Sequence, residues 1–227
     1  TRRSSDLGVT GVITPVFTGS SAINLEEALL KAENAGFAKV VQLISTIFLL
    51  GIPAIAFSLI VWKSPLQTMG FTSNISGKQF FLAVLFVFAG LLVGGGLGTL
   101  NKAIPLPADM AAYFQQLEDD YNSQVLALSH MQTTADYVFA LFILGLMPAI
   151  FEEMFFRGCL QQVMVSLFRN ALAGILVTSI FFSAIHLSFY GFLPRLFLGL
   201  MLGYIFYYSK NLWLSIAVHF LNRSEEH

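Results

Sequence analysis

A series of long apolar runs limits the fold of this 227-residue chain more than any other feature of its sequence. The first run covers residues 38–62 and the second covers residues 80–100. At about 1.5 Å of rise per residue, a helix of such length can cross a hydrocarbon core of roughly 30 Å. Charged residues make up only 11% of the chain, against roughly 25% in a soluble domain. The sequence therefore predicts a membrane protein.

Six apolar runs predict an all-α fold, a polytopic transmembrane helical bundle with about six spans. The later runs cover residues 137–156, 171–187, 192–208 and, cut short, 212–221. The expected organisation is an N-terminal amphipathic, interfacial segment at 1–37, a transmembrane domain at 38–222 and a tail at 223–227. The acidic stretch 101–136 is expected to be a polar connection outside the hydrocarbon, with His130 exposed on it.

Charge and cysteine content exclude several classes of protein. The net charge is −1 and no basic run is present, so nucleic acid is not an expected partner. The single Cys159 excludes an internal disulfide framework. Basic residues near the span ends favour one side as cytoplasmic, and the site described next is expected to open toward that side. Membrane lipids are expected partners, and the oligomeric state stays open.

Ionisable residues inside apolar runs are costly, so each is a functional candidate. The third run ends with Glu152, Glu153 and Arg157. Glu153 and Arg157 are i,i+4 neighbours on a helix and can form an ion pair. Glu152 points about 100° away from Glu153, which leaves it without Arg157 as a partner. Glu152 is therefore the better candidate for a proton acceptor.

Polar residues also recur on one face of the fourth run. Ser179, Phe182, Ser183 and His186 follow the i, i+3, i+4, i+7 pattern, so this face is expected to pack against protein. The last run contributes His219 and Asn222, three residues apart.

Two carboxylates, two imidazoles and an amide can thus converge between helices, and this set of groups suits peptide hydrolysis. Glu152 with His186 would hold and deprotonate a water, while His219 and Asn222 would donate hydrogen bonds to the oxyanion. No cofactor is required by this chemistry; the alternative is one divalent metal such as zinc, held by Glu152, His186 and His219.

These motifs resemble those of the CPBP family, which includes type II CAAX prenyl endopeptidases and bacteriocin-processing or immunity proteins. The resemblance rests on Glu152-Glu153-xxx-Arg157, Phe182-xxx-His186 and His219-xx-Asn222 preceded by Trp213. It implies an intramembrane endopeptidase acting on a membrane-associated peptide or a lipidated, CAAX-like C-terminal segment. It also implies that Glu153, Arg157 and Phe182 support the site. One departure is that members often carry the asparagine four residues after the last histidine, where this chain has Arg223.

Two other classes of function compete with the protease. A noncatalytic membrane scaffold or immunity protein of the same family would keep the motifs without the chemistry. A small transporter would also place Glu and His in the membrane, but the sequence shows no pair of related halves with interrupted helices. The transporter ranks last for that reason.

Overall fold

The structure is a computed structural model that describes residues 34–72, 75–128, 131 and 133–224. Every regular element in those ranges is helical, which confirms the predicted all-α fold. The first 33 residues, which hold most of the predicted interfacial segment, lie outside the described residues, as do His130 and residues 225–227.

The first and third apolar runs each form a long helix that changes its winding just before a proline. The first comprises α3 (Ala35–Thr46), the π-helical η2 (Ile47–Gly51) and α4 (Ile52–Val61), and Pro53 lies in the first turn of α4. Proline lacks the N–H that would continue the i→i−4 ladder. A local π segment is one way for a helix to accommodate that loss.

The third run repeats this design around Pro148. It comprises α8 (Thr134–Ala140), η3 (Leu141–Leu146), α9 (Met147–Glu153), η4 (Met154–Gln161) and α10 (Gln162–Phe168). Pro148 lies in the first turn of α9. The second π-helical segment, η4, begins directly after the glutamate pair. π-Helical turns are frequent at functional sites.

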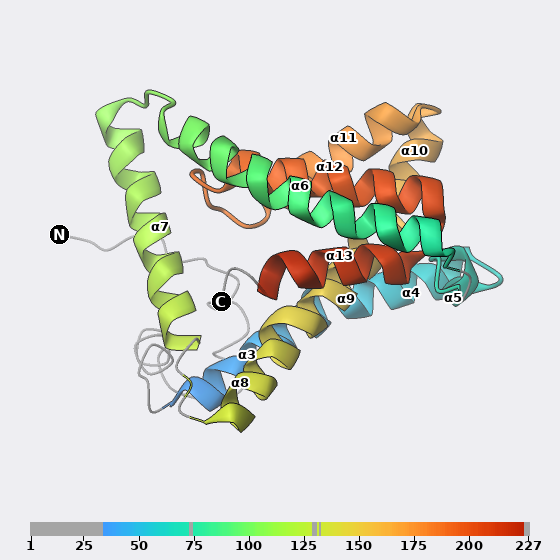
Figure 1. Cartoon of the computed structure of the whole chain (residues 1–227), viewed down its shortest axis with the longest axis horizontal. Coiled ribbons are helices and arrows are strands. Elements are labelled where there is room, and N and C mark those ends of the chain that lie inside the picture. The colour runs from blue at the N-terminus through green and yellow to red at the C-terminus, as the bar shows by residue number, and fades with distance from the viewer. Residues whose placement is uncertain (1–33, 73–74, 129–130, 132, 225–227) are drawn as a thin grey trace.

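The helices form two groups with one helix between them (Figure 1). The helix α6 (Gly77–Lys102) packs on α12 (Phe192–Ser209), and α11 (Ala171–Ala184) packs on both α10 and α12. The other group contains α3, α4, α8 and α9, and the helix that begins with α8 extends through η4 and α10 to reach α11 in the first group. Between them lies α13 (Leu212–Ser224), which contacts α6 and α12 on one side and α9 and η3 on the other. Its side chains therefore face both groups.

Four helices in the described residues are long and apolar enough to cross a membrane, where the sequence predicted about six spans. They cover Ala35–Val61, Gly77–Lys102, Thr134–Phe168 and Phe192–Ser209. The two remaining predicted spans are the short helices α11 and α13, at 14 and 13 residues. At about 1.5 Å per residue, each reaches only roughly 20 Å. The chain is a multi-pass membrane protein.

The acidic stretch is not a simple connection, because most of it is the 21-residue helix α7 (Ala108–Leu128). This helix lies across the ends of the other helices (Figure 1). Its Phe114 ring stacks on Phe189, with the centroids 4.8 Å apart. Glu118 Oε2 accepts a hydrogen bond from Ser188 Oγ at 2.7 Å. Thus α7 holds the connection between α11 and α12, which carries His186.

Glycines allow the close approach of α11 and α12. A Cβ added at Gly199 would lie 3.0 Å from Ser179 Cβ, and one at Gly203 would lie 2.7 Å from a methyl carbon of Ile175. The glycines of α6 differ from one another in their contacts. Gly90 abuts Met201, but an added Cβ at Gly94, Gly95 or Gly96 would meet nothing within 4 Å.

Candidate active site

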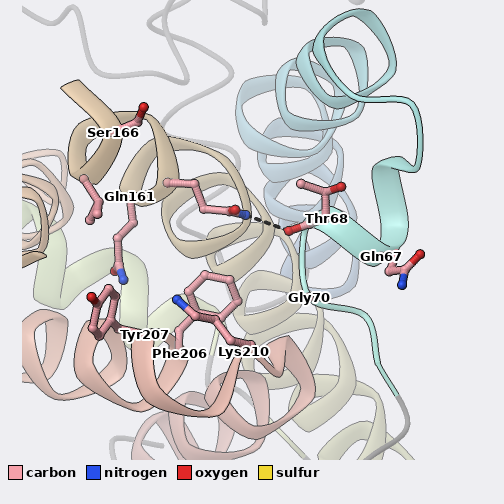
Figure 2. A pocket seen from close by; sticks show the side chains of 10 residues that line it. Gln67, Thr68, Gly70, Gln161, Ser166, Phe206, Tyr207 and Lys210 are labelled. Atoms are coloured by element: carbon pink, nitrogen blue, oxygen red, sulfur yellow. Dashed lines mark hydrogen bonds between the residues drawn. The ribbon is translucent and has the colours of Figure 1, made fainter. Parts of the chain in front are cut away.

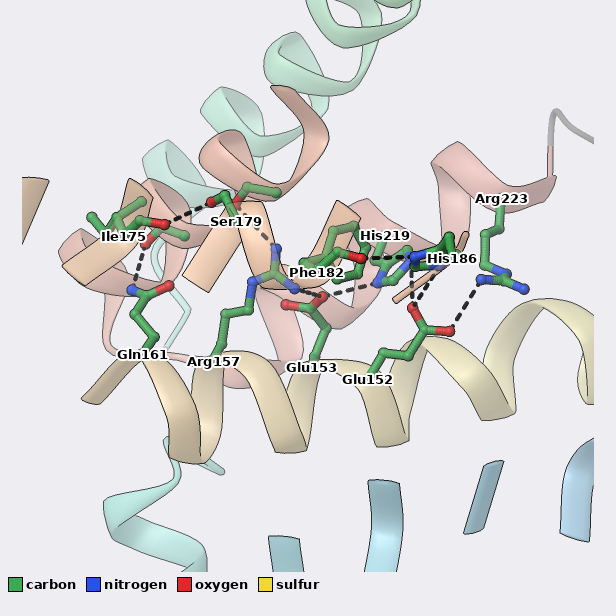
Figure 3. A network of polar contacts seen from close by, with 12 residues as sticks. Glu152, Glu153, Arg157, Gln161, Ile175, Ser179, Phe182, His186, His219 and Arg223 are labelled. Atoms are coloured by element: carbon green, nitrogen blue, oxygen red, sulfur yellow. Dashed lines mark hydrogen bonds and ion pairs between the residues drawn. The ribbon is translucent and has the colours of Figure 1, made fainter. Parts of the chain in front are cut away.

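A buried row of charged and polar side chains runs along the third span and faces α12, α13 and α11 (Figure 3). The row consists of Glu152, Glu153, Arg157 and Gln161, all buried. Charges enclosed in a bundle are costly unless each finds a partner. The contacts of these four residues therefore define the site.

Glu153 and Arg157 form the predicted i,i+4 ion pair, with Oε1 and Nη1 2.8 Å apart and neither side chain exposed. Arg157 also donates from Nη2 to the carbonyl oxygen of Gly199 at 3.0 Å. One turn further, Gln161 Nε2 donates to the carbonyl oxygen of Gly203 at 2.9 Å. The two glycines of α12 have no side chain to cover their carbonyls, which stay open to these donors. The hydrogen bonds from Arg157 and Gln161 therefore tie the third span to α12.

His219 on α13 joins the two glutamates. Its Nδ1 lies 2.9 Å from Glu153 Oε1, and its Nε2 lies 3.7 Å from Glu152 Oε2. Because the carboxylate of Glu153 already accepts from Arg157, it is an acceptor for His219 as well, and the Nδ1 carries the proton. The ring of His219 is buried, so this contact fixes both its tautomer and its orientation.

His186 reaches the same carboxylate from the end of α11. Its Nδ1 lies 2.7 Å from the carbonyl oxygen of Phe182, and because a carbonyl only accepts, this Nδ1 also carries a proton. Its Nε2 lies 4.0 Å from Glu152 Oε2. The polar stripe predicted on this helix faces protein, with Ser179, Ser183 and Phe182 all buried.

Phe182 is the centre around which the charged groups are arranged. The guanidinium carbon of Arg157 lies 4.6 Å from its ring centroid. The rings of His186 and His219 meet it edge to face at 5.1 and 5.7 Å. Such contacts favour a cation over the ring face and add to packing. The position of Phe182 explains why a phenylalanine belongs with the polar motif.

The structure brings Arg223, not Asn222, to the glutamate. Arg223 Nη1 lies 3.2 Å from Glu152 Oε1. Asn222 instead lines a pocket of about 450 Å³ between α6 and α12, together with Gly94 and Arg195, and makes no hydrogen bond to Glu152 or either histidine in the described chain. A residue four positions after His219 is turned only about 40° from it around α13, whereas one three positions after is turned about 60° the other way.

A different polar pocket, of about 400 Å³, lies between α5 (Pro65–Thr68), α10 and the end of α12 (Figure 2). Its polar lining includes Gln67, Gln162 and Lys210. Gln162 Nε2 closes one wall by donating to the carbonyl oxygen of Thr68 at 2.8 Å. Gln161, from the buried row, lines this pocket, whereas Glu152, Glu153, His186 and His219 do not.

Sequence reasoning did not assign Arg223 to the site or recognise two residues that hold His186 in place. Asn101 on α6 is buried; it donates to the carbonyl oxygen of Phe189 and accepts from the N–H of Leu193, both at 2.8 Å. Glu118 on α7 contacts the same connection through Ser188. Asn101 could have been found from the sequence, because it is a polar amide at the end of an otherwise apolar span.

Fold and site together define a class: a multi-pass helical membrane protein with a buried carboxylate–imidazole centre. Residues 134–224 match the model of a family described as type II CAAX prenyl endopeptidase Rce1-like. Residues 134–224 are therefore similar to the Rce1-like domain of the CPBP family, and the resemblance drawn from the motifs in this segment is confirmed. No curated protein and no solved structure matches the chain. The matched segment begins with α8 and ends with α13, so it contains every residue of the site.

Proposed function

We propose that this protein is an intramembrane endopeptidase that hydrolyses a peptide bond with a water activated by Glu152. Family membership supports a protease, and the carrying observation is the convergence of Glu152, His186 and His219 from three separate helices. The substrate class suggested by the family is a membrane-associated peptide or a lipidated C-terminal segment. Membrane lipids would surround the spans.

Oε2 of Glu152 and Nε2 of His186 suit a shared water. At 4.0 Å apart, both atoms can lie at hydrogen-bond distance from one water between them. Since the Nδ1 of His186 donates to a carbonyl, its Nε2 has a lone pair when the ring is neutral. The carboxylate and this nitrogen would then accept the two hydrogens of the water, which turns a lone pair of its oxygen toward the substrate.

In the reaction, Glu152 Oε2 takes one proton as the water oxygen bonds to the scissile carbonyl carbon. The electron pair of the C=O bond moves onto its oxygen. The proton held by Glu152 then passes to the amide nitrogen as the C–N bond breaks. The same carboxylate thus acts first as base and then as acid, and no other proton carrier is needed.

His219 is suited to stabilise the oxyanion only as an imidazolium. Its Nδ1–H is directed at Glu153, so its Nε2 donates a hydrogen bond only when that nitrogen is protonated too. The carboxylate of Glu153, 2.9 Å from Nδ1, would pair with such an imidazolium. In this proposal Glu153 orients His219, and Arg157 holds Glu153 in place.

The chemistry is proposed to proceed without a metal ion. A zinc ion would be held by Glu152, His186 and His219, but Arg223 places a guanidinium 3.2 Å from Oε1 of the same Glu152. A divalent cation on that carboxylate would meet this positive charge at close range. No set of three His, Cys, Asp or Glu side chains with metal-binding geometry occurs among residues with a described position.

The test uses a quenched fluorescent peptide with an S-farnesyl cysteine and a free C-terminal tripeptide, in detergent micelles with the purified protein. Wild type should cleave it, and Glu152→Gln, which keeps the size and loses the base, should not. Equal thermal unfolding of the two proteins would assign the loss to chemistry. Cleavage at the wild-type rate by Glu152→Gln would exclude this mechanism and favour a noncatalytic protein of the same family.

A further inference from the structure

Two contacts hold the side chain of Arg223 beside Glu152, the proposed base. Four residues before Pro148, the carbonyl of Leu144 cannot receive an i→i−4 hydrogen bond, because proline has no N–H. Arg223 Nε donates to this carbonyl at 3.0 Å. Its Nη1 lies 3.2 Å from Glu152 Oε1. The guanidinium is thus held by one backbone oxygen and one carboxylate oxygen.

This arrangement assigns the two oxygens of Glu152 to different partners. Oε1 faces Arg223, and Oε2 faces the Nε2 atoms of His186 and His219. Arg223 therefore fixes the rotation of the carboxylate and leaves the oxygen that faces both imidazoles for the water. The arginine side chain is 22% exposed, whereas that of Glu152 is 9% exposed, so Arg223 lies on the more accessible side of the pair.

The attack step moves negative charge away from Glu152. Before it, the carboxylate balances Arg223; during it, Oε2 becomes protonated and the negative charge appears on the former carbonyl oxygen of the substrate. A guanidinium has five N–H donors, and the two contacts of Arg223 use two of them. The remaining N–H groups can donate to the new oxyanion while the side chain stays near Glu152. The positive charge of the guanidinium is permanent.

We propose that Arg223 is a catalytic residue that neutralises Glu152 before the attack and donates to the oxyanion after it. This inference rests on the proposed function. The motif that this chain resembles often has a neutral asparagine at this position, whereas the geometry here provides a cation. The oxyanion would therefore be held by two positive groups, Arg223 and the imidazolium of His219, in a site enclosed by protein.

The experiment compares Arg223→Gln, Arg223→Lys and Arg169→Gln with wild type and Glu152→Gln, using the same farnesylated peptide in micelles. Arg169 is exposed at the end of α10 and controls for loss of a positive charge elsewhere. We expect Arg223→Gln to lower kcat about 10²- to 10³-fold, as for loss of an oxyanion donor, with KM nearly unchanged. Arg223→Lys should retain intermediate kcat, and Arg169→Gln should match wild type.

A second measurement separates a catalytic role from a structural one. In Arg223→Ala, added guanidinium chloride at millimolar concentration should restore part of kcat, because the ion can enter the space that the side chain has left. Equal kcat for the Lys and Gln variants, or no rescue, would overturn the proposal. If Arg223→Gln cleaves at the wild-type rate while Glu152→Gln is inactive, this inference fails and the proposed function stands. If Glu152→Gln is active, the proposed function itself fails.

Discussion

The Nδ1 of His219 lies 2.9 Å from Glu153 Oε1, and this contact joins the last helix to the third span inside the bundle. Glu153 thereby serves two groups at once, since the same oxygen accepts from Arg157 at 2.8 Å. Glu152, its neighbour in sequence, faces Arg223 through Oε1 and the Nε2 atoms of His186 and His219 through Oε2. One glutamate of the pair therefore organises the site, and the other is left for chemistry.

Glu153→Gln should be more damaging to stability than Glu152→Gln. It leaves the guanidinium of Arg157, which is fully buried, without its carboxylate, and breaking a buried ion pair from one side costs about 3–5 kcal/mol. Thermal or denaturant unfolding in detergent measures the difference. Similar stabilities for the two variants would contradict this assignment of roles.

Two substitutions of His219 should separate its two nitrogens. The side-chain amide of Asn lies near the position of Nδ1, so His219→Asn can keep the donor to Glu153 but loses Nε2. His219→Gln places its amide near Nε2 and loses the donor to Glu153. We expect the Asn variant to unfold near the wild-type temperature and to be inactive, and the Gln variant to be less stable but to keep residual cleavage. The reverse pattern would show that Nδ1 is the functional nitrogen.

Asn101→Ala should loosen the connection that carries His186. It leaves the carbonyl of Phe189 and the N–H of Leu193 without their partner, and each unsatisfied buried group costs about 1–3 kcal/mol. Hydrogen exchange should accelerate at residues 187–193, and kcat should fall. Unchanged exchange there would mean that Glu118 on α7 holds the connection alone.

The same substitution at two glycines should have opposite effects. A Cβ at Gly174 would lie 2.6 Å from the backbone nitrogen of Val165, and backbone cannot move away cheaply, so Gly174→Ala should destabilise by about 1–3 kcal/mol. At Gly94, on α6, a Cβ meets nothing within 4 Å. There Gly94→Ala should stabilise the helix by about 0.5–1 kcal/mol. Unfolding in detergent compares them, and a gain at Gly174 would exclude the close contact of α10 and α11.

Chelation of divalent ions should leave cleavage of the farnesylated peptide unchanged. The reason is the cation at Glu152, since Arg223 already pairs with the carboxylate that a metal would need. Activity before and after dialysis against a chelator, followed by addition of zinc, measures this. Loss on dialysis with recovery on zinc would place a metal at Glu152, His186 and His219 instead.

Helical periodicity predicted relations within one helix well. The pairing of Glu153 with Arg157 and the buried stripe of Ser179, Phe182 and Ser183 follow from about 100° per residue and are confirmed. Periodicity says less about how one helix is rotated against another. It placed His219 and Asn222 together, whereas the rotation of α13 directs Arg223 to Glu152 and Asn222 toward α6 and α12.

The sequence by itself determined an all-helical membrane protein and the residue types of its site, because apolar length and costly charges are visible in one dimension. The number of long spans, the helix α7 and the partners of each glutamate were decided only by tertiary structure. The physical reason is that a buried charge is stable only where another helix supplies its partner. Which side chains become partners depends on how α11, α12 and α13 are rotated and how closely they approach the third span. Glycine contacts and the π segments next to the prolines set this geometry.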